Sequence, residues 1–389
     1  MNRISSARYE QLDSLRGLAA LTVVIHHLFL VPLALTPFFQ LLFHFKSPAK
    51  LLISGHAAVL LFFVLSGFVL SLPLHRHQSV DYLPFLLKRL FRIYLPYLVS
   101  ILIAMGAASL FYSGSIDGLS SWFQSSWKQP LDPASFMEHM VLIGNIHSDL
   151  YNNVIWSLIH ELRISLIFPF VILLLNRSHW AASILACFVF SLIGGLNNVY
   201  HWELSNGFHT TYFDSLHYLS FFILGSLLAK HQAAFLHHYK KLSFPVKITL
   251  LLLSLLCYIY ATYPTVITNQ ISFLAPFNPI LIDYITAAGA SGIIVLALSS
   301  SALSKLLLTK PLLFLGNISF SLYLYHLTVL LGLVHSLHQK LPLPVILLLS
   351  LPLSIGVSAV MWYVFERRFA EQGRALAHKL AKSPIPIKA

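Results

Sequence analysis

The sequence predicts an all-α protein, a multi-pass transmembrane helical bundle of about ten spans with both termini in the cytoplasm. Hydrophobic residues make up 57% of its 389 residues and charged residues only 10%. This balance excludes an ordinary soluble domain. Apolar runs of about 20 residues recur along the chain, and each is long enough to cross a bilayer core. The placement of Lys and Arg between these runs then predicts the orientation.

The expected spans lie near residues 15–36, 51–74, 93–113, 154–176, 180–196, 213–229, 243–263, 280–300, 312–335 and 342–365. With the N-terminus inside, 19 of the 25 Lys and Arg fall in cytoplasmic segments, four fall outside, and two, Arg16 and Arg163, lie within spans. Such a positive-inside excess places both termini in the cytoplasm and favours an even number of spans. We expect the first span to be retained, because no clear small-residue cleavage site accompanies it.

The remaining composition excludes several classes of partner. The formal net charge of +12 is explained by the topology, so nucleic acid is not an expected partner. Cys187 and Cys257 lie in apolar runs and are expected to be inert thiols. The 20 histidines show no metal-ligand spacing joined to a third ligand, so no metal site is predicted. We expect one membrane domain at residues 1–369 and a basic cytoplasmic tail at 370–389, which begins as a short amphipathic helix.

The first span carries an arginine and two adjacent histidines in apolar surroundings. Ionisable groups inside a bilayer usually face the protein interior and mark a functional path. Arg16 and His27 are 11 residues apart, so they share a helix face and lie about 16 Å apart along the axis. His26 is rotated by about 100° onto another face. An imidazole, with an ordinary pKa of about 6.5, is suited to general-base chemistry.

Two further stretches each support two interpretations. Ser66-Gly67 in the second span is typical of close helix packing, with a substrate contact as the alternative. Arg89 and Arg92 are three residues apart at the inner surface, and therefore share a helix face. They either anchor the topology or grip phosphates with their forked guanidinium groups.

The fourth and ninth spans add buried polar groups. Glu161 lies at nearly the depth of His27, so the two side chains can meet if their helices are neighbours. A carboxylate at this depth needs a histidine, an arginine or a proton as partner. Trp156 fits an interfacial anchor. Tyr323 and His326 belong to a polar stretch that either serves chemistry or joins helices.

Together, these stretches resemble the membrane acyltransferase-3 family of bacterial O-acyltransferases. The resemblance runs from residue 13 to residue 369 and rests on six motifs in the family order. They are Arg16 followed by ten residues and His27, Phe-Phe-Val-Leu-Ser-Gly-Phe (62–68), Arg89-x-x-Arg92, Trp-Ser-Leu-x-x-Glu (156–161), Gly-x-Ile-Ser-x-Ser-Leu-Tyr-Leu-Tyr-His (316–326) and Phe-Glu-Arg-Arg-Phe (365–369). The family's fused extracytoplasmic hydrolase-like domain is not expected here.

The resemblance implies an enzyme of the bacterial cytoplasmic membrane that moves an acyl group, most often acetyl, from cytoplasmic acyl-CoA to a hydroxyl of a carbohydrate at the outer face. Acyl-CoA would be a co-substrate, and no permanently bound cofactor is implied. His27 would be the general base, Arg16 would hold the donor or stabilise developing charge, and Glu161 would orient the imidazole. Arg89 and Arg92 would hold the CoA phosphates. Candidate substrate-lining residues are Ser66, Trp156, Tyr323 and His326.

Two alternatives stay open. The same site could use a bulkier donor such as succinyl-CoA. The protein could also be a transporter of glycans or lipid-linked sugars, with its buried charges forming a relay. Transporters often carry paired repeats and broken helices in corresponding places, and this sequence shows neither.

Overall fold

The computed structural model describes residues 9–32, 47–77, 81–128 and 131–381. The prediction of a multi-pass helical bundle is confirmed: within these ranges nine helices are long and apolar enough to cross a membrane, and α11 is a shorter apolar helix. The only β-bridge in the described residues joins Pro32 to Leu119. Several parts of the predicted charge count and tail lie outside the described residues, namely Arg3, Arg8, Lys46 and residues 382–389.

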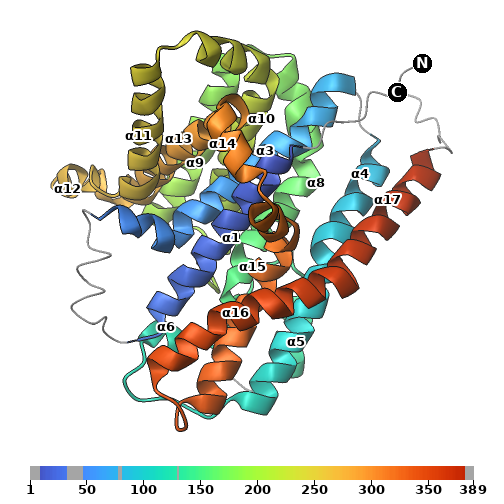
Figure 1. Ribbon diagram of the computed structural model, residues 1–389, viewed down its shortest axis with the longest axis vertical. Helices are drawn as coiled ribbons and strands as arrows, with labels where there is room; N and C mark the ends of the chain where they lie inside the picture. Colours follow the sequence, from blue (N-terminus) through green and yellow to red (C-terminus); the bar gives the residue numbers. More distant parts are fainter. Residues whose placement is uncertain (1–8, 33–46, 78–80, 129–130, 382–389) are drawn as a thin grey trace.

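Eleven longer or site-forming helices make up the bundle (Figure 1). They are α1 (Glu10–Leu30), α3 (Gly55–His77), α4 (Tyr82–Arg89), α5 (Leu95–Phe111), α8 (Trp156–Asn176), α9 (Trp180–Tyr200), α10 (Tyr212–Lys241), α11 (Phe244–Tyr260), α13 (Asn278–Ser299), α15 (Lys310–Leu337) and α16 (Leu343–Met361). Short helices occupy the connections: α6 (Ser121–Ser125), α7 (Pro133–Met140), α12 (Thr265–Thr268) and α14 (Ser301–Leu307). A last helix, α17 (Arg367–Ala381), ends the described chain. Helices α11, α13, α15 and α16 each carry proline in their first two positions, where its missing N–H is not needed.

Helices α1 and α15 form the centre of the bundle, and they cross in close contact. A β-carbon at Gly17 would lie 2.5 Å from the Gly316 nitrogen, so the two backbones touch where only glycine fits. Ten residues further along each helix, His27 and His326 meet again. The equal step of ten residues on both helices shows that α1 and α15 run parallel. This agrees with the predicted topology, in which the first and ninth spans cross the membrane in the same direction.

Helices α3 and α10 pack in the same manner. Gly67 of α3 faces the backbone of Phe222, and Gly225 of α10 faces the backbone of Val64. This contact accounts for the Ser-Gly pair in the second span: its glycine allows close packing. Its serine, Ser66, points to a different neighbour, described below.

Two of the long helical passages contain a π-helical turn. Leu90–Tyr94 joins α4 to α5, and Trp362–Glu366 joins α16 to α17. Figure 1 shows α16 and α17 as one long path that reaches α4, and α17 contacts α4 and Leu90–Tyr94. A π-turn inserts a residue and re-aims the side chains around it, and such turns are frequent at functional sites.

The bundle has two chemically different ends. We call the end with Lys88, Arg89, Arg92 and Arg374 the basic end, and the end with segments 112–128, 131–152 and 201–211 the loop end. The loop end is tied together by Arg163, whose guanidinium donates to the carbonyls of Ile143, Thr210 and Thr211 at 2.9–3.0 Å. Arg163 therefore holds the loops in place and is not the partner of Glu161.

Candidate active site

His27 is positioned by His326 across the contact between α1 and α15. The Nδ1 atom of His27 lies 2.9 Å from Nε2 of His326, and the two ring planes are inclined by only 22°. His326 is 1% exposed and is fixed in turn by a hydrogen bond of 2.8 Å from its Nδ1 to the Leu322 carbonyl. The sequence places both histidines at similar depth but does not predict that they pair.

This chain of hydrogen bonds defines the tautomer of each neutral ring. A carbonyl oxygen only accepts, so Nδ1 of His326 carries a proton and its Nε2 is left as an acceptor. Nδ1 of His27 must then donate to that nitrogen. The proton of neutral His27 thus lies on Nδ1, and Nε2 keeps a lone pair with no hydrogen-bond partner among the described residues. A histidine held in this way is ready to accept a proton.

A tryptophan from the first long loop lies beside this pair. The Trp122 ring is nearly parallel to that of His27, with an interplanar angle of 9° and centroids 5.2 Å apart. Its helix, α6, is fixed to the end of α1, because Ser120 donates from its backbone nitrogen to Val31 and from its hydroxyl to Leu30. Trp122 therefore covers His27 on the side of the loop end. Trp122 was not among the predicted site residues, because nothing in the sequence of an irregular loop indicates which span the loop contacts.

Glu161 pairs with Arg89 instead of orienting His27. Its Oε1 accepts from Nη2 of Arg89 at 2.6 Å and from the Ser66 hydroxyl at 3.3 Å. Arg89 Nε also donates to Ser165 at 3.2 Å, so the guanidinium is held on two sides. The expected position of Glu161 beside His27 is taken by His326. Arg89 is 8% exposed and is committed to this ion pair, which changes the role expected for it.

The other arginine of the Arg-x-x-Arg motif, Arg92, belongs to a second charge cluster at the same end. It lies on the π-turn between α4 and α5, within electrostatic range of Arg16 and of Glu366 on the other π-turn. The carboxylate of Glu366 accepts hydrogen bonds from the Ser321 nitrogen and hydroxyl at 3.2 and 2.6 Å. The two π-turns thus bring Arg92 and Glu366 together. Unlike Arg89, Arg92 is exposed to the space beside it.

These charges surround a cavity of about 620 Å³, which we call the basic cavity. It opens between α3, α4, α8 and α17, and its charged lining residues are Arg16, Lys88, Arg89, Arg92, Arg374, Asp81 and Glu161, together with His378. Five cationic side chains face two carboxylates, one of which is neutralised by Arg89. The cavity therefore favours an anionic ligand.

A second, narrow cavity continues from the first. It shares Arg16, Ser66 and Glu161 with the basic cavity and extends to Ser157 and Tyr323. Its volume of about 30 Å³ holds only about two waters. A substrate arm therefore passes only if lining side chains change rotamer. Tyr323, whose ring lies 6.3 Å from that of His326, brings this passage next to the histidine pair.

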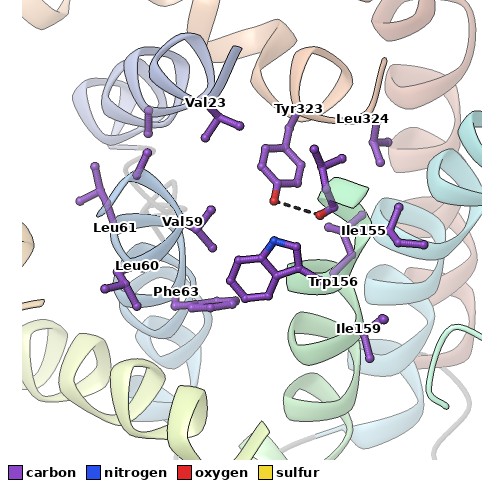
Figure 2. Close-up of a cluster of buried hydrophobic side chains, with 14 of the residues drawn as sticks. Val23, Val59, Leu60, Leu61, Phe63, Ile155, Trp156, Ile159, Tyr323 and Leu324 are labelled. Carbon is purple, nitrogen blue, oxygen red and sulfur yellow. Dashed lines mark hydrogen bonds between the residues drawn. The ribbon is translucent and has the colours of Figure 1, made fainter. Parts of the chain in front are cut away.

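Tyr323 is held in one orientation. Its hydroxyl donates to the Val154 carbonyl at 3.0 Å, so it accepts from the Ser157 hydroxyl at 2.7 Å. Figure 2 shows Tyr323 directed toward the start of α8, across from Val23 and Val59. In the same cluster Trp156 packs edge-on against Phe63, with centroids 6.3 Å apart. Trp156 is 6% exposed and lines neither cavity, so the structure places it in the core instead of at a membrane surface.

A second polar network lies near the loop end, away from the two cavities. Asp283 of α13 contacts His56 of α3 at 2.6 Å and His217 of α10 at 3.1 Å. The Asp283 carboxylate thus joins three helices, and a hydrogen bond between His217 and Ser191 extends the network to α9. In the described part of the chain, no group of three or more His, Cys, Asp or Glu is arranged to hold a metal ion. We interpret the network as a structural cross-link, in which each nitrogen satisfies a different oxygen of Asp283.

The fold and the site define a multi-pass membrane protein with a basic cavity and a buried histidine pair, and comparison with known proteins identifies its family. The family model described as an acyltransferase domain, Acyl_transf_3, matches residues 9–363, and the chain belongs to this family. Among its relatives is the O-acetyltransferase OatA of Staphylococcus aureus, in strains NCTC 8325, COL and MRSA252. Each is 27% identical over 345 residues, which cover 85% of this chain and 52% of the relative. The chain thus spans about half the length of these relatives, and no solved structure matches it.

Proposed function

We propose that the protein transfers an acyl group, acetyl in the first instance, from cytoplasmic acyl-CoA to a hydroxyl of a carbohydrate on the outer side of the bacterial cytoplasmic membrane. In this proposal the basic end faces the cytoplasm and the loop end faces outward, in accord with the positive-inside distribution. The observation that carries the proposal is the lone pair of His27 Nε2. It is held in a defined tautomer by His326, whose ring lies 6.3 Å from that of Tyr323 in the narrow cavity that continues from the basic cavity.

The cations of the basic cavity support the proposal that acyl-CoA binds there. Acyl-CoA combines phosphate groups at one end with a long, uncharged arm that carries the thioester at the other. Arg92 is accessible in the basic cavity and suits the phosphates, whereas Arg89 is already paired with Glu161. Arg16 lines both cavities, about 16 Å along α1 from His27, which is too far to contact a thioester beside the histidine. We therefore assign Arg16 to holding the donor, and not to the reacting carbonyl.

The chemistry at His27 is a proton transfer coupled to acyl transfer. Nε2 of His27 takes the proton of the acceptor hydroxyl while that oxygen attacks the thioester carbon. The carbon–sulfur bond of the tetrahedral intermediate then breaks, and the imidazolium returns the proton to the departing CoA thiolate. The products are an ester and CoA thiol, and no further reactant is needed. Trp122 covers His27, and the narrow cavity is nearly closed, so water that would hydrolyse the thioester is excluded.

The proposal is tested with purified protein in detergent, labelled acetyl-CoA or succinyl-CoA, and candidate glycans. We expect acceptor-dependent incorporation of label, and a donor KM raised about tenfold in Arg92→Ala, since a charge-assisted contact is lost. Arg92→Lys should recover only part of this, because lysine lacks the guanidinium fork. Arg177→Ala is the matched control, an exposed arginine that does not line the basic cavity. No transfer from either donor, or equal donor KM values in Arg92→Ala and Arg177→Ala, would contradict the proposal.

A further inference from the structure

Helix α17 forms one wall of the basic cavity, although it lies beyond the matched family domain. The family match ends at residue 363, and α17 spans Arg367–Ala381. Four of its residues line the cavity, at positions that repeat as i, i+3, i+4 and i+7: Arg374, Ala377, His378 and Ala381. This spacing forms a single stripe along a helix. The segment expected to be a separate basic tail therefore contributes side chains to the same space as Arg92.

The helix is docked firmly enough to hold that stripe in place. Gly373 is buried against Phe91, where a β-carbon would lie 2.6 Å from the Phe91 β-carbon. Ala377 is fully buried. Only small residues allow such a close approach of α17 to the π-turn that carries Arg92. A freely solvated tail would need neither feature.

The stripe alternates small and charged side chains in a way that suits a bound anion. Ala377 and Ala381 leave space in the wall, while Arg374 and His378 are exposed toward it. Lys88 of α4 is exposed on the facing wall. Arg89 is paired with Glu161, and Arg16 and Arg92 are within electrostatic range of Glu366. The other cations that line the cavity, Lys88 and Arg374, are exposed, and His378 lies on the same helix stripe as Arg374.

We propose that α17 is part of the donor site and that Arg374, with Lys88 and His378, binds the 3′-phosphate of the acyl donor. The proposal rests on the function proposed above. The thioester must reach His27 through the narrow cavity, so the opposite end of the donor remains at the mouth. That end carries the 3′-phosphoadenosine group, whose dianionic phosphate matches the fork of Arg374. The helix thereby distinguishes a 3′-phosphorylated donor from its dephosphorylated form.

The test compares acetyl-CoA with 3′-dephospho-acetyl-CoA on the full-length protein in detergent. We expect Arg374→Ala to raise the KM for acetyl-CoA about tenfold, to leave kcat nearly unchanged, and to leave the KM for the dephosphorylated donor unchanged. Lys379→Ala is the matched control, because Lys379 carries the same charge on the same helix without lining the cavity. Arg374→Glu should raise the KM for acetyl-CoA more than Arg374→Ala does, because the introduced carboxylate repels the 3′-phosphate.

Failure of this inference is separable from failure of the proposed function. If the wild-type protein transfers acyl groups from acetyl-CoA but Arg374→Ala and Lys379→Ala have the same KM, α17 is not part of the donor site. An equal rise for both donors in Arg374→Ala would also overturn the inference, since the 3′-phosphate would not be the group recognised. A wild-type protein that neither binds nor uses acetyl-CoA would instead overturn the proposed function itself.

Discussion

Replacing His27 by alanine is expected to lower kcat for acyl transfer by about 10²–10⁴-fold, because the acceptor hydroxyl loses its general base. The donor KM should change little, since His27 does not line the basic cavity and Arg16, its cation on α1, lies about 16 Å away along the helix. The measurement is steady-state transfer of labelled acetyl groups by protein that is membrane-inserted and monodisperse in detergent.

The neighbouring histidine supplies the control for this prediction. The ring of His26 packs against Gly55 at the start of α3. Its centroid lies 5.7 Å from that of His27, but the hydrogen bond that orients His27 comes from His326 and not from His26. His26→Ala should therefore keep most of the activity. Equal losses in His26→Ala and His27→Ala would mean that disturbed packing of α1 causes the defect. A well-folded His27→Ala protein with full activity would remove His27 from the mechanism.

Replacing His326 by leucine is expected to lower kcat by about 10²-fold or more, although His326 acts through His27. Without an acceptor beside Nδ1, the tautomer of neutral His27 that carries its proton on Nδ1 is no longer favoured. In the other tautomer Nε2 carries the proton, so it cannot accept one from the acceptor hydroxyl. In a catalytic triad, a histidine in the wrong tautomer lowers kcat by at least as much. His326 is therefore a positioning residue.

A conservative variant separates this role from simple packing. His326→Gln can offer an amide oxygen to Nδ1 of His27, so it should recover part of the kcat lost in His326→Leu. The donor KM should be the same in both variants and in the wild type. Equal kcat values in His326→Gln and His326→Leu, or a raised donor KM, would show that His326 supports the fold or the donor instead of the tautomer.

The helical bundle was predictable from sequence because burial in a membrane leaves a strong local signal. Runs of apolar residues such as those that became α3 and α8 are long enough to span, and their ends agree with the structure to within a few residues. The short helices α6 and α7 were not predicted in the loop 114–153. Their positions depend on contacts such as Ser120 with Leu30, which no local pattern encodes.

The candidate site was predictable in its depth but not in its pairings. Hydropathy and helix rise place His27, Glu161 and His326 at similar levels, and this is why Glu161 was expected beside His27. Which helix faces meet is determined by packing, above all by Gly17 against Gly316, which brings His326 to His27. Arg89 pairs with Glu161 because α4 packs against α8. The start of the tail 370–389 was predicted to form a short amphipathic helix, but the docking of α17 beside Arg92 depends on the contact of Gly373 with Phe91.

The central claim is that the donor enters at the basic end and the acceptor is modified at the loop end, and sided supply of substrate tests it most directly. Protein is reconstituted into vesicles in which α17, marked by a protease site after Ala381, faces only the outside. Labelled acetyl-CoA is added to one side and glycan acceptor to the other. The account predicts acylated glycan only when acetyl-CoA is on the side of α17 and the glycan on the opposite side. Product formed only with the reverse arrangement would contradict it.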